Sequence, residues 1–459
     1  MKHTIPSHVF RAYDIRGIVE KDLTTEFVYN LGLALGTFAR EQNISSLNIG
    51  YDGRLHSPDI AENLIRGILV TGCNVTNIGL VATPILYFAN YHLGNNSGIM
   101  ITGSHNPPQY NGFKMVFNGS TLTAEDIQQL KRIISNNKYY IDKQLGQLTL
   151  KNIIEHYYNA ITETIKLSKR NLIVVDAGNG IAGAFAPILY RRLGAKVLGL
   201  NCIVDGNFPN HHPDPAKHEN LQELIAAVIK NKADLGLAFD GDGDRLGVVT
   251  QDGTIIYPDR QLMLFATDIL SKHQGGKIIF DVKSTSMLKN WIKKYGGEPI
   301  MCRTGHSYVK AKMKETGALM AAEMSGHMFF KDRWFGFDDA IYAGARLLEL
   351  LSQVDDPSLV LNSLPNMVST PEINIAVEHD GEQHKIIQKL QKTTHFDQAE
   401  AVNMLDGIRV EYKDGFSLVR ASNTTPCLVL RFEAKSQKKL EEIKQQMYEQ
   451  IKTHAKINI

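Results

Sequence analysis

A pattern of apolar run, polar turn and amphipathic segment recurs three times along the chain. In each copy a short apolar stretch ends at an Asp, a polar turn and a helix-like segment follow, and a second β-like stretch closes the unit. The paired stretches lie at 47–54 and 72–75, at 172–179 and 194–197, and at 278–284 and 297–300. Each copy predicts a buried strand, an amphipathic helix and a return strand, the βαβ arrangement in which helices pack on mixed or parallel sheets.

Three copies predict three similar mixed-sheet α/β domains, and the remainder predicts a smaller C-terminal α+β domain, all four around a central cleft. Residues 363–372, with Pro365 and Pro371, are predicted to form a linker. After it come an alternating strand at 373–377, an apolar strand at 427–432 and a charged helix from Gln437 to about Lys452. The expected domains are 1–150, 151–252, 253–363 and 364–459.

Composition limits the classes of function. With 459 residues, 43% hydrophobic and 21% charged, the chain has the composition of an ordinary soluble globular protein. A net charge of +2 gives no bulk attraction to nucleic acid or to an anionic membrane. No apolar run approaches the roughly 20 residues of a membrane span, and the first ten residues lack the apolar core of a signal peptide. We therefore expect a cytoplasmic protein that binds neither nucleic acid nor membrane.

The cysteines add one further limit. All four are widely scattered and none forms a CxxC pair, so neither a zinc site nor a disulfide framework is expected. They are Cys73, Cys202, Cys302 and Cys427.

The segment Asp240-Gly241-Asp242-Gly243-Asp244-Arg245 carries the strongest chemical signal. Three carboxylates at alternate positions can converge on one Mg²⁺, which prefers oxygen ligands and leaves room for a phosphate. A solvated acidic turn is the alternative, but it follows the apolar stretch 235–239, and crowded carboxylates repel unless a cation neutralises them. An EF-hand needs Gly at the sixth loop position and Glu at the twelfth, where this chain has Arg245 and Gln251. The segment therefore predicts a metal site, with Arg245 suited to a phosphate or an ion pair.

Ser104 is the candidate carrier of that phosphate. It lies in Thr102-Gly103-Ser104-His105-Asn106-Pro107, after the apolar stretch 99–101, and the sequence is not the Gly-x-Ser-x-Gly of a nucleophile elbow. A lone loop serine is usually only a turn or cap residue. Beside His105, Asn106 and the later Lys114, however, a phosphoserine would supply an oxygen to the metal. The two segments together indicate phosphoryl transfer through a phosphoserine.

Two further segments suggest substrate contacts. Residues 420–425 combine an Arg, which can hold a phosphate with two hydrogen bonds, with small hydroxyl and amide side chains, and the alternative is a polar turn before a strand. In residues 323–327, Glu323 and Ser325 stand at alternate positions and could bond vicinal sugar hydroxyls, although a buried polar loop explains them as well. Individually weaker candidates are Tyr13, Arg16, Lys283, Arg303 and His306.

Over its full length the chain resembles the α-D-phosphohexomutase family. The resemblance rests on five ordered motifs at residues 13–17, 102–107, 240–245, 323–327 and 420–424. Within the family, Glu323-Met324-Ser325-Gly326-His327 together with residues 420–424 is similar to the bacterial bifunctional phosphomannomutase/phosphoglucomutase branch.

The resemblance implies a role for each candidate residue. Ser104 would be the phosphoserine, and its phosphate would hold Mg²⁺ together with Asp240, Asp242 and Asp244. The residues implied around the reacting groups are Arg16, His105, Lys114, Arg245 and His306, with Lys114 or His306 as acid/base candidates. The implied sugar contacts are Glu323, Ser325 and His327, and the implied ligands of the distal phosphate are Arg420, Ser422, Asn423 and Thr424. Further implied substrate contacts are Tyr13, Lys283 and Arg303.

The implied reaction interconverts hexose 1-phosphate and hexose 6-phosphate of mannose and glucose. It passes through a hexose 1,6-bisphosphate that reorients between two transfers and also serves as activator, and the enzyme is expected to be a monomer. Three alternatives remain open: a phosphoglucosamine mutase, a metal-dependent sugar phosphatase, and a non-catalytic sugar-phosphate binder. The preferred sugar is not decided by the sequence, because mannose and glucose differ only at C2.

Overall fold

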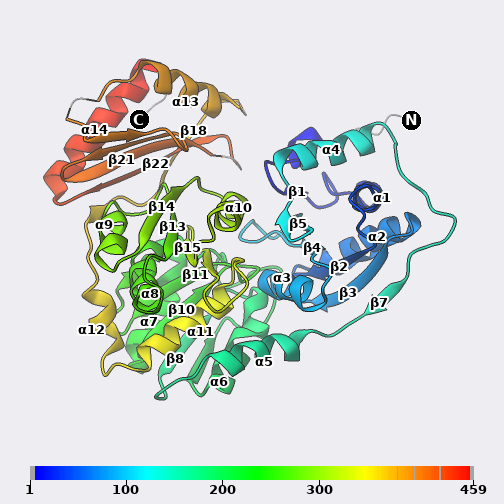
Figure 1. Cartoon of the computed structure of the whole chain (residues 1–459), viewed down its shortest axis with the longest axis horizontal. Coiled ribbons are helices and arrows are strands. Elements are labelled where there is room, and N and C mark those ends of the chain that lie inside the picture. Colours follow the sequence, from blue (N-terminus) through cyan, green and yellow to red (C-terminus); the bar gives the residue numbers. More distant parts are fainter. Residues whose placement is uncertain (1–5, 380, 397, 423–424, 455–459) are drawn as a thin grey trace. The chain divides into compact units, whose positions relative to one another are not determined.

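The computed structural model describes residues 6–379, 381–396, 398–422 and 425–454 (Figure 1). The chain divides into two compact units. The first contains Met1–Pro258 and Ser325–Ser363, and the second contains Asp259–Met324 and Leu364–Ile459. In the part of the chain that is described, no helix has both the length and the apolar character needed to cross a membrane.

The first sheet of the first unit has the order β1-β5-β4-β2-β3-β7, with β6 beside β5. β2 is parallel to β3 and β4, β3 is parallel to β7, and β5 is antiparallel to β1 and β4. The strands are β1 (Ile15–Ile18), β2 (Ser46–Tyr51), β3 (Asn74–Leu80), β4 (Gly98–Ile101), β5 (Tyr110–Phe117), β6 (Ser120–Thr121) and β7 (Leu148–Leu150).

The helices of this part pack on the sheet through an apolar core. Side chains of α1, α2 and α4 form one buried cluster with those of the strands, because their apolar positions recur at helical spacing. The helices are η1 (Ser7–Val9), α1 (Thr25–Glu41), α2 (Ser57–Val70), α3 (Thr83–His92) and α4 (Ala124–Ser135).

The second sheet of the same unit has the order β12-β11-β10-β8-β9. β8 is parallel to β9 and β10, whereas β11 is antiparallel to β10 and β12, so this sheet is also mixed. Its strands are β8 (Leu172–Asp176), β9 (Lys196–Leu200), β10 (Leu235–Phe239), β11 (Leu246–Thr250) and β12 (Ile255–Ile256). The remaining elements of the unit are α5 (Ile154–Thr164), η2 (Ile181–Ala184), α6 (Ala186–Leu193), η3 (His218–Leu221), α7 (Gln222–Asn231), β16 (Met328–Phe330), α11 (Ala340–Leu351) and α12 (Pro357–Asn362).

The second unit begins with a third parallel arrangement. Its strand β13 (Lys277–Asp281) is parallel to β14 (Glu298–Cys302) and to β15 (Met320–Ala322). The associated helices are α8 (Pro258–Lys272), α9 (Met287–Lys294) and α10 (His306–Thr316).

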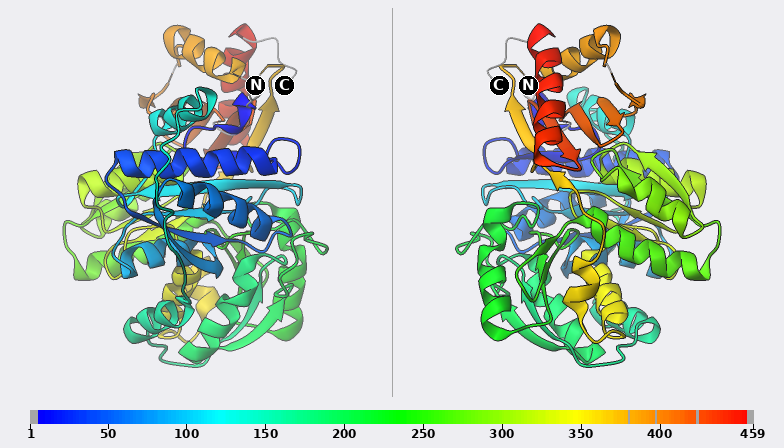
Figure 2. Two further views of the ribbon diagram at one scale, coloured as in Figure 1. Left: turned by 90° about the vertical axis from the view of Figure 1, so that its right-hand side faces the viewer. Right: turned by 90° about the vertical axis from the view of Figure 1, so that its left-hand side faces the viewer.

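An antiparallel sheet completes the second unit, in the order β17-β22-β21-β20-β19 with β18 also beside β22. Helices α13 and α14 cover it and share its apolar core, and Figure 2 shows α14 in red beside these strands. The elements are β17 (Val368–Ser369), β18 (Ile373–Ala376), α13 (Glu382–Thr393), β19 (Ala401–Asn403), β20 (Ile408–Tyr412), β21 (Gly415–Ala421), β22 (Cys427–Ala434) and α14 (Gln437–His454).

Buried polar contacts tie the antiparallel sheet to the end of β13. Nη1 of Arg409 on β20 donates to the carbonyl oxygens of Val282 and Ser284, each at 2.6 Å. The carboxylate of Glu433 on β22 accepts a hydrogen bond from the Thr285 hydroxyl at 2.9 Å. Because these partners have little exposure to water, the contacts fix the loop after β13 against the sheet.

The structure confirms the expected fold class. The three predicted strand-and-return pairs are β2/β3, β8/β9 and β13/β14, each parallel and each joined through a helix. All four cysteines are free thiols. Within the predicted linker 363–372, the backbone of Val368 and Ser369 pairs with β22 and forms the short strand β17. The four domain boundaries stay predictions.

Candidate functional site

The loop between β10 and β11 carries three buried carboxylates. β10 and β11 are antiparallel neighbours with Phe239 opposite Leu246, so the strand pair fixes both ends of the loop. The side chains of Asp240, Asp242 and Asp244 have no exposed surface, and one oxygen of each lies within 4.8 Å of the others. We call these three the carboxylate cluster. Three carboxylate charges that are this close together and fully buried repel strongly, so the cluster needs a neighbouring cation.

The two oxygens of Asp240 have separate tasks. Oδ1 accepts the backbone N–H groups of Gly243, Asp244 and Arg245 at 3.1, 3.1 and 3.2 Å, which folds the loop around it. Oδ2 faces the Ser104 hydroxyl instead, at 2.9 Å. Burial, followed by the charges of Asp244 and Asp242, raises the pKa of Asp240 well above its usual range. A divalent cation is the group that would keep all three carboxylates ionised.

One oxygen of the carboxylate cluster supports the same conclusion. Oδ1 of Asp242 is buried and has no hydrogen-bond partner among the described residues. Its Oδ2 accepts from the Thr83 hydroxyl at 2.5 Å and from Lys114 Nζ at 2.6 Å. A buried carboxylate oxygen without a donor is costly, and binding a hard cation would satisfy it. The donor set, three carboxylates and a neighbouring hydroxyl, fits Mg²⁺.

Ser104 lies on the loop between β4 and β5, which we call the Ser104 loop (residues 102–109). Its backbone has φ +48°, in the left-handed region, and its side chain is 2% exposed. His105 Nδ1 lies 3.0 Å from the Ser104 hydroxyl. Burial, reinforced by the charges of Arg245 and Arg16, lowers the pKa of His105 well below its usual value, so the imidazole is neutral. A neutral imidazole nitrogen can donate to this hydroxyl or accept from it.

Lys114, on β5, is the counter-ion of the carboxylate cluster. Its Nζ donates to Asp242 and also to Asp244 Oδ2. Burial favours the neutral amine, but the charges of Asp242 and Asp244 outweigh it and raise the pKa of Lys114 well above its usual value. Likewise burial would raise the pKa of Asp244, but Lys114 and then His327 hold it well below its usual range.

Arg245 and His327 close another side of the cluster. Their backbones form a β-bridge, and Leu246 N donates to Gly326 O at 3.1 Å. His327 Nε2 lies 3.2 Å from Asp244 Oδ1, and its Nδ1 lies 3.1 Å from the Ser325 hydroxyl. His327, predicted as a sugar contact, thus contacts the carboxylate cluster.

Arg16, on β1, reaches the Ser104 loop. Its Nη2 donates to Asp14 Oδ2 at 2.7 Å and its Nη1 donates to Asn106 Oδ1 at 2.5 Å. Tyr13 precedes β1 and is half-buried. The first unit therefore brings together ten of the predicted residues around Ser104: Ser104 itself, Arg16, His105, Lys114, Asp240, Asp242, Asp244, Arg245, Ser325 and His327.

The remaining described candidates lie in the second unit. Arg420 Nε donates to Asp406 Oδ2 at 3.0 Å, and the same oxygen accepts the backbone N–H of Thr304 at 3.0 Å. Asp406 thus joins Arg420 to the loop before α10. At the start of that helix, Glu323 Oε1 accepts the N–H of Gly305 at 2.5 Å.

Other predicted contacts of the second unit have these surroundings. Lys283 Nζ donates to Glu372 Oε2 at 2.9 Å, and the Arg303 guanidinium lies 4.7 Å from the centre of the Tyr308 ring. The Ser422 hydroxyl bonds that of Thr425 at 2.9 Å. His306 is the first residue of α10. Asn423 and Thr424 lie outside the described residues.

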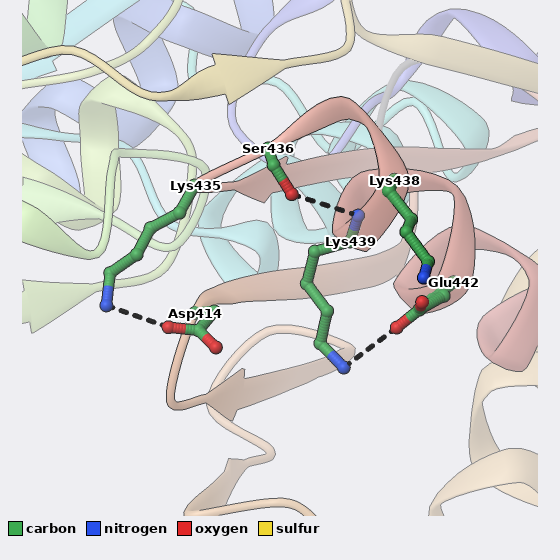
Figure 3. Close-up of a pocket in the computed structure, with 6 residues that line it drawn as sticks. All are labelled: Asp414, Lys435, Ser436, Lys438, Lys439 and Glu442. Carbon is green, nitrogen blue, oxygen red and sulfur yellow. Dashed lines mark hydrogen bonds and ion pairs between the residues drawn. The ribbon is translucent and has the colours of Figure 1, made fainter.

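A separate hollow in the second unit, of about 360 Å³, lies at the start of α14 (Figure 3). Two of its lysines already have carboxylate partners: Lys435 bonds Asp414 at 2.7 Å and Lys439 bonds Glu442 at 3.0 Å. Surface ion pairs of this kind contribute little to folding stability. Because each of these two lysines is paired with a carboxylate, neither offers a free positive charge to a phosphate.

Sequence reasoning missed three residues of the site. Thr83, at the start of α3, holds Asp242 through its hydroxyl and also donates its N–H to the Asp242 carbonyl at 3.0 Å. Asp14 orients Arg16, although it lies inside the first recognised motif. Arg54 follows the turn that ends β2, and its guanidinium bonds the Ser104 loop. A turn pattern identifies the position of Arg54 but not its partners, which lie about 50 residues away.

Comparison with known proteins matches the chain to four family models in order. The phosphoglucomutase/phosphomannomutase models match as alpha/beta/alpha domain I at residues 7–141, domain II at 154–253, domain III at 257–367 and the C-terminal domain at 372–450. Together they span nearly the whole chain.

Individual relatives agree along almost their entire length. A phosphoglucomutase of Neisseria meningitidis is 55% identical over 442 residues, 96% of each chain. A phosphomannomutase/phosphoglucomutase of Pseudomonas aeruginosa is 52% identical over 450 residues, 98% of this chain and 96% of that one. The crystal structure of a phosphoglucomutase/phosphomannomutase family protein from Burkholderia thailandensis superposes with a TM-score of 0.93 at 48% identity, covering 98% and 99% of the two chains.

Proposed function

Because this chain belongs to the phosphoglucomutase/phosphomannomutase family, we propose that it interconverts the 1-phosphate and 6-phosphate of glucose and mannose, with Ser104 as the phosphate carrier. Two relatives support the proposal: one that is 55% identical and named phosphoglucomutase, and one that is 52% identical and named phosphomannomutase/phosphoglucomutase. The single observation that carries the role of Ser104 is the 2.9 Å contact between its hydroxyl and Asp240 inside the carboxylate cluster.

The reaction consists of two transfers that conserve phosphoryl groups. The phosphoserine P–Oγ bond breaks as the O6 hydroxyl of a bound hexose 1-phosphate attacks phosphorus, and the O6 proton leaves to a base. The hexose 1,6-bisphosphate then turns around, and Ser104 Oγ takes the phosphoryl group from O1, which regains a proton. Hexose 6-phosphate and phosphorylated enzyme result. Because the intermediate carries two phosphates, the site must hold the end that does not react as well.

The carboxylate cluster and its neighbouring side chains have proposed roles at the transferring phosphoryl group. Asp240, Asp242, Asp244 and a Ser104 phosphate would hold Mg²⁺, which offsets the charge of the transferring group when it is bound. Lys114, whose pKa is raised well above normal by Asp242 and Asp244 against the effect of burial, holds its proton and suits stabilisation of negative charge on the transferring group. It is retained beside His306 as an acid/base candidate. Arg16 adds positive charge beside the Ser104 loop, and Arg245 adds it beside Asp240. His105 is neutral and bonds the Ser104 hydroxyl.

Recognition of the sugar and of the second phosphate is proposed for the other candidates. Glu323, Ser325 and His327 would bond sugar hydroxyls, and His306 is retained as the alternative acid/base. The distal phosphate is assigned to Arg420 with Ser422, Asn423 and Thr424, and further substrate contacts to Tyr13, Lys283 and Arg303. Arg420 supports this assignment because a buried arginine at the end of a strand can hold a phosphate with two charged hydrogen bonds.

One assay separates the mutase from its alternatives. The enzyme is incubated with Mg²⁺, a trace of hexose 1,6-bisphosphate and, separately, glucose, mannose or glucosamine 1-phosphate, and both 6-phosphate and inorganic phosphate are measured. We expect glucose and mannose 6-phosphates with little phosphate release. Dominant release of inorganic phosphate would indicate a sugar phosphatase. Preference for glucosamine 1-phosphate would indicate a phosphoglucosamine mutase, and the absence of turnover would indicate a non-catalytic sugar-phosphate binder.

A further inference from the structure

The Arg54 side chain lies behind the Ser104 loop and bonds its backbone. It is 2% exposed, and it follows Asp52 and Gly53 at the carboxyl end of β2. Its two Nη atoms donate to four carbonyl oxygens of the loop and of the first residue of β5: Asn106 at 2.6 Å, Pro107 at 2.7 Å, Ser104 at 2.8 Å and Tyr110 at 2.9 Å. A longer contact of 3.4 Å reaches Pro108.

Two further contacts hold the guanidinium in this place. Its Nε lies 3.3 Å from Asp52 Oδ2, an oxygen that also accepts the N–H of Gly103 at 3.2 Å. On another side, the guanidinium carbon lies 5.1 Å from the centre of the Phe208 ring. A Cβ atom added at Gly103 would come within 2.4 Å of the guanidinium carbon, so the loop backbone is packed directly on the cation.

The Ser104 loop needs such support. Ser104 adopts a left-handed backbone conformation, which is uncommon for a residue with a Cβ atom and persists where surrounding contacts hold it. The Ser104 N–H bonds the Thr102 hydroxyl at 2.8 Å, and its carbonyl points to Arg54. With both backbone groups held, the side chain is directed to Asp240.

We propose that Arg54 is a positioning residue that sets where the Ser104 oxygen, and any phosphate on it, stands relative to the carboxylate cluster. The proposal rests on the proposed role of Ser104. Arg54 bonds carbonyl oxygens of the loop, and no hydrogen bond joins it to the Ser104 hydroxyl or to the carboxylate cluster, so its geometric effect passes through the loop backbone. Its charge also acts on Asp242, and Arg54→Lys keeps that charge. A planar fork of donors is needed to reach four carbonyls at once, and lysine, with one ammonium group, cannot replace it.

A purely structural role for Arg54 makes a different prediction. A buried arginine that only stabilises the fold would, when replaced, lower the unfolding midpoint but leave kcat unchanged for each folded molecule. Arg346 provides the matched control. It is a fully buried arginine of the same unit, and its guanidinium pairs with Asp332 at 3.0 Å, away from the Ser104 loop.

The test compares full-length Arg54→Lys with Arg346→Lys and the parent. For each protein one measures the unfolding midpoint, the phosphate incorporated at Ser104 from hexose 1,6-bisphosphate, the ³¹P resonance of the phosphoserine, and kcat and KM per phosphorylated molecule. We expect Arg54→Lys to lose about 10- to 100-fold in kcat with KM within about threefold, because small displacements of a reacting group have effects of this size. Its ³¹P resonance should shift or broaden. Arg346→Lys should lose stability but keep the parent kcat and resonance.

A milder variant covers the case in which Arg54→Lys fails to fold. Phe208→Leu removes the ring beside the guanidinium but leaves Arg54 in place, and we expect a fall of about threefold in kcat with KM unchanged. Parent kcat and parent ³¹P resonance in both variants, or in Phe208→Leu if it alone folds, would overturn the positioning role. Absence of phosphate at Ser104 in the parent would instead overturn the proposed function, so the two failures are distinguishable.

Discussion

At the scale of single residues, Asp242 depends most clearly on a cation. It has a buried oxygen without a hydrogen-bond partner among the described residues, and its other oxygen is shared by Thr83 and Lys114. Lys114 donates to Asp242 and Asp244, and Arg245 Nε lies 3.9 Å from Asp240 Oδ2, but neither contacts the unpaired oxygen of Asp242. A divalent cation would satisfy that oxygen.

Removing the Asp242 charge should weaken the metal site. In Asp242→Asn, one anionic ligand becomes a neutral amide, and we expect the Mg²⁺ concentration for half-maximal activity to rise at least about tenfold. Chelator should abolish turnover of the parent, and Mg²⁺ should restore it. Glu155→Gln is the control, since Glu155 pairs with Arg192 on the surface. An unchanged Mg²⁺ requirement in Asp242→Asn would exclude this carboxylate from the metal site.

Residue chemistry was predictable from sequence only where the motif itself carried it. The alternating aspartates predict a cation site because their spacing alone brings like charges together. Thr83 gave no such signal, since its partner Asp242 is 159 residues away and a threonine before a proline is typical of a helix start. The same holds for Arg54, which only the folded chain brings to the Ser104 loop.

At the scale of elements, the two loops meet through Gly241. A Cβ atom at this position would lie 2.3 Å from the carbonyl oxygen of Ser104. The glycine therefore permits the loop after β10 and the Ser104 loop to approach closely enough for the Ser104 hydroxyl to reach Asp240. This explains why a glycine separates the first two aspartates, beyond the needs of a turn.

Gly241→Ala should separate the two loops. The new methyl group would clash with the Ser104 carbonyl oxygen, which already accepts a hydrogen bond from Arg54. The resulting backbone shift would move the Ser104 hydroxyl away from Asp240. We expect kcat to fall at least about tenfold. Gly199→Ala is the control, because a Cβ atom there would come no closer than 3.3 Å to the Cys202 sulfur. Equal kcat in Gly241→Ala and parent would show that the loops tolerate separation.

The end of β8 carries a pH-dependent contact that serves stability. His211 Nε2 lies 3.0 Å from Asp176 Oδ2, and this hydrogen bond, against the opposing effect of burial, raises the pKa of His211 to about 9. Because the pKa of His211 is higher in the folded state, the His211–Asp176 contact contributes fully to the free energy of unfolding below the unfolded-state pKa of about 6.5. This contribution is lost as pH rises through about 9.

Urea unfolding across pH measures this contribution. His211→Gln should be about 1–2 kcal/mol less stable than the parent near pH 6, and the difference should shrink as pH rises to about 10. His218→Gln, at an exposed site on η3, should follow the parent at every pH. A difference that stays constant from pH 6 to pH 10 would mean that the pair is not titrating in this range.

Element prediction worked best where hydrophobic pattern and turn agreed. The strands β8, β10 and β13 are continuous apolar runs ended by Asp, and all three appear where the sequence indicated. The strand β17 was missed because its two residues lie in a proline-bounded segment and form a strand only by pairing with β22, a contact across about 65 residues.

At the scale of the whole molecule, the chain carries its candidate groups in two units. The phosphoserine candidate and the carboxylate cluster belong to the first, whereas Arg420 and Glu323 belong to the second. The sequence predicted the three βαβ copies and a smaller C-terminal α+β domain. Pattern alone could not indicate that the antiparallel sheet of the second unit is fixed to the loop after β13 by Arg409 and Glu433.

Arg420→Ala should weaken binding of both substrates. Losing charged hydrogen bonds to a phosphate, worth roughly 1.5–3 kcal/mol, should raise KM for glucose and mannose 1-phosphates about 10- to 100-fold. Because the bisphosphate would be held less firmly, more of it, or more phosphate, should be released per turnover. Lys435→Ala, which removes a surface pair with Asp414, is the control. If KM and the ratio of isomerisation to release both match the parent, Arg420 is only part of a polar turn.

The central claim, that Ser104 carries the phosphoryl group, is tested most directly by following that group. The parent and Ser104→Ala are incubated with ³²P-labelled glucose 1,6-bisphosphate and examined by intact mass and peptide mapping, and the labelled parent is then mixed with glucose 1-phosphate. We expect an addition of ~80 Da on the Ser104 peptide of the parent alone, and its transfer to sugar at least as fast as turnover. Label on another residue, or full turnover in Ser104→Ala, would contradict the claim.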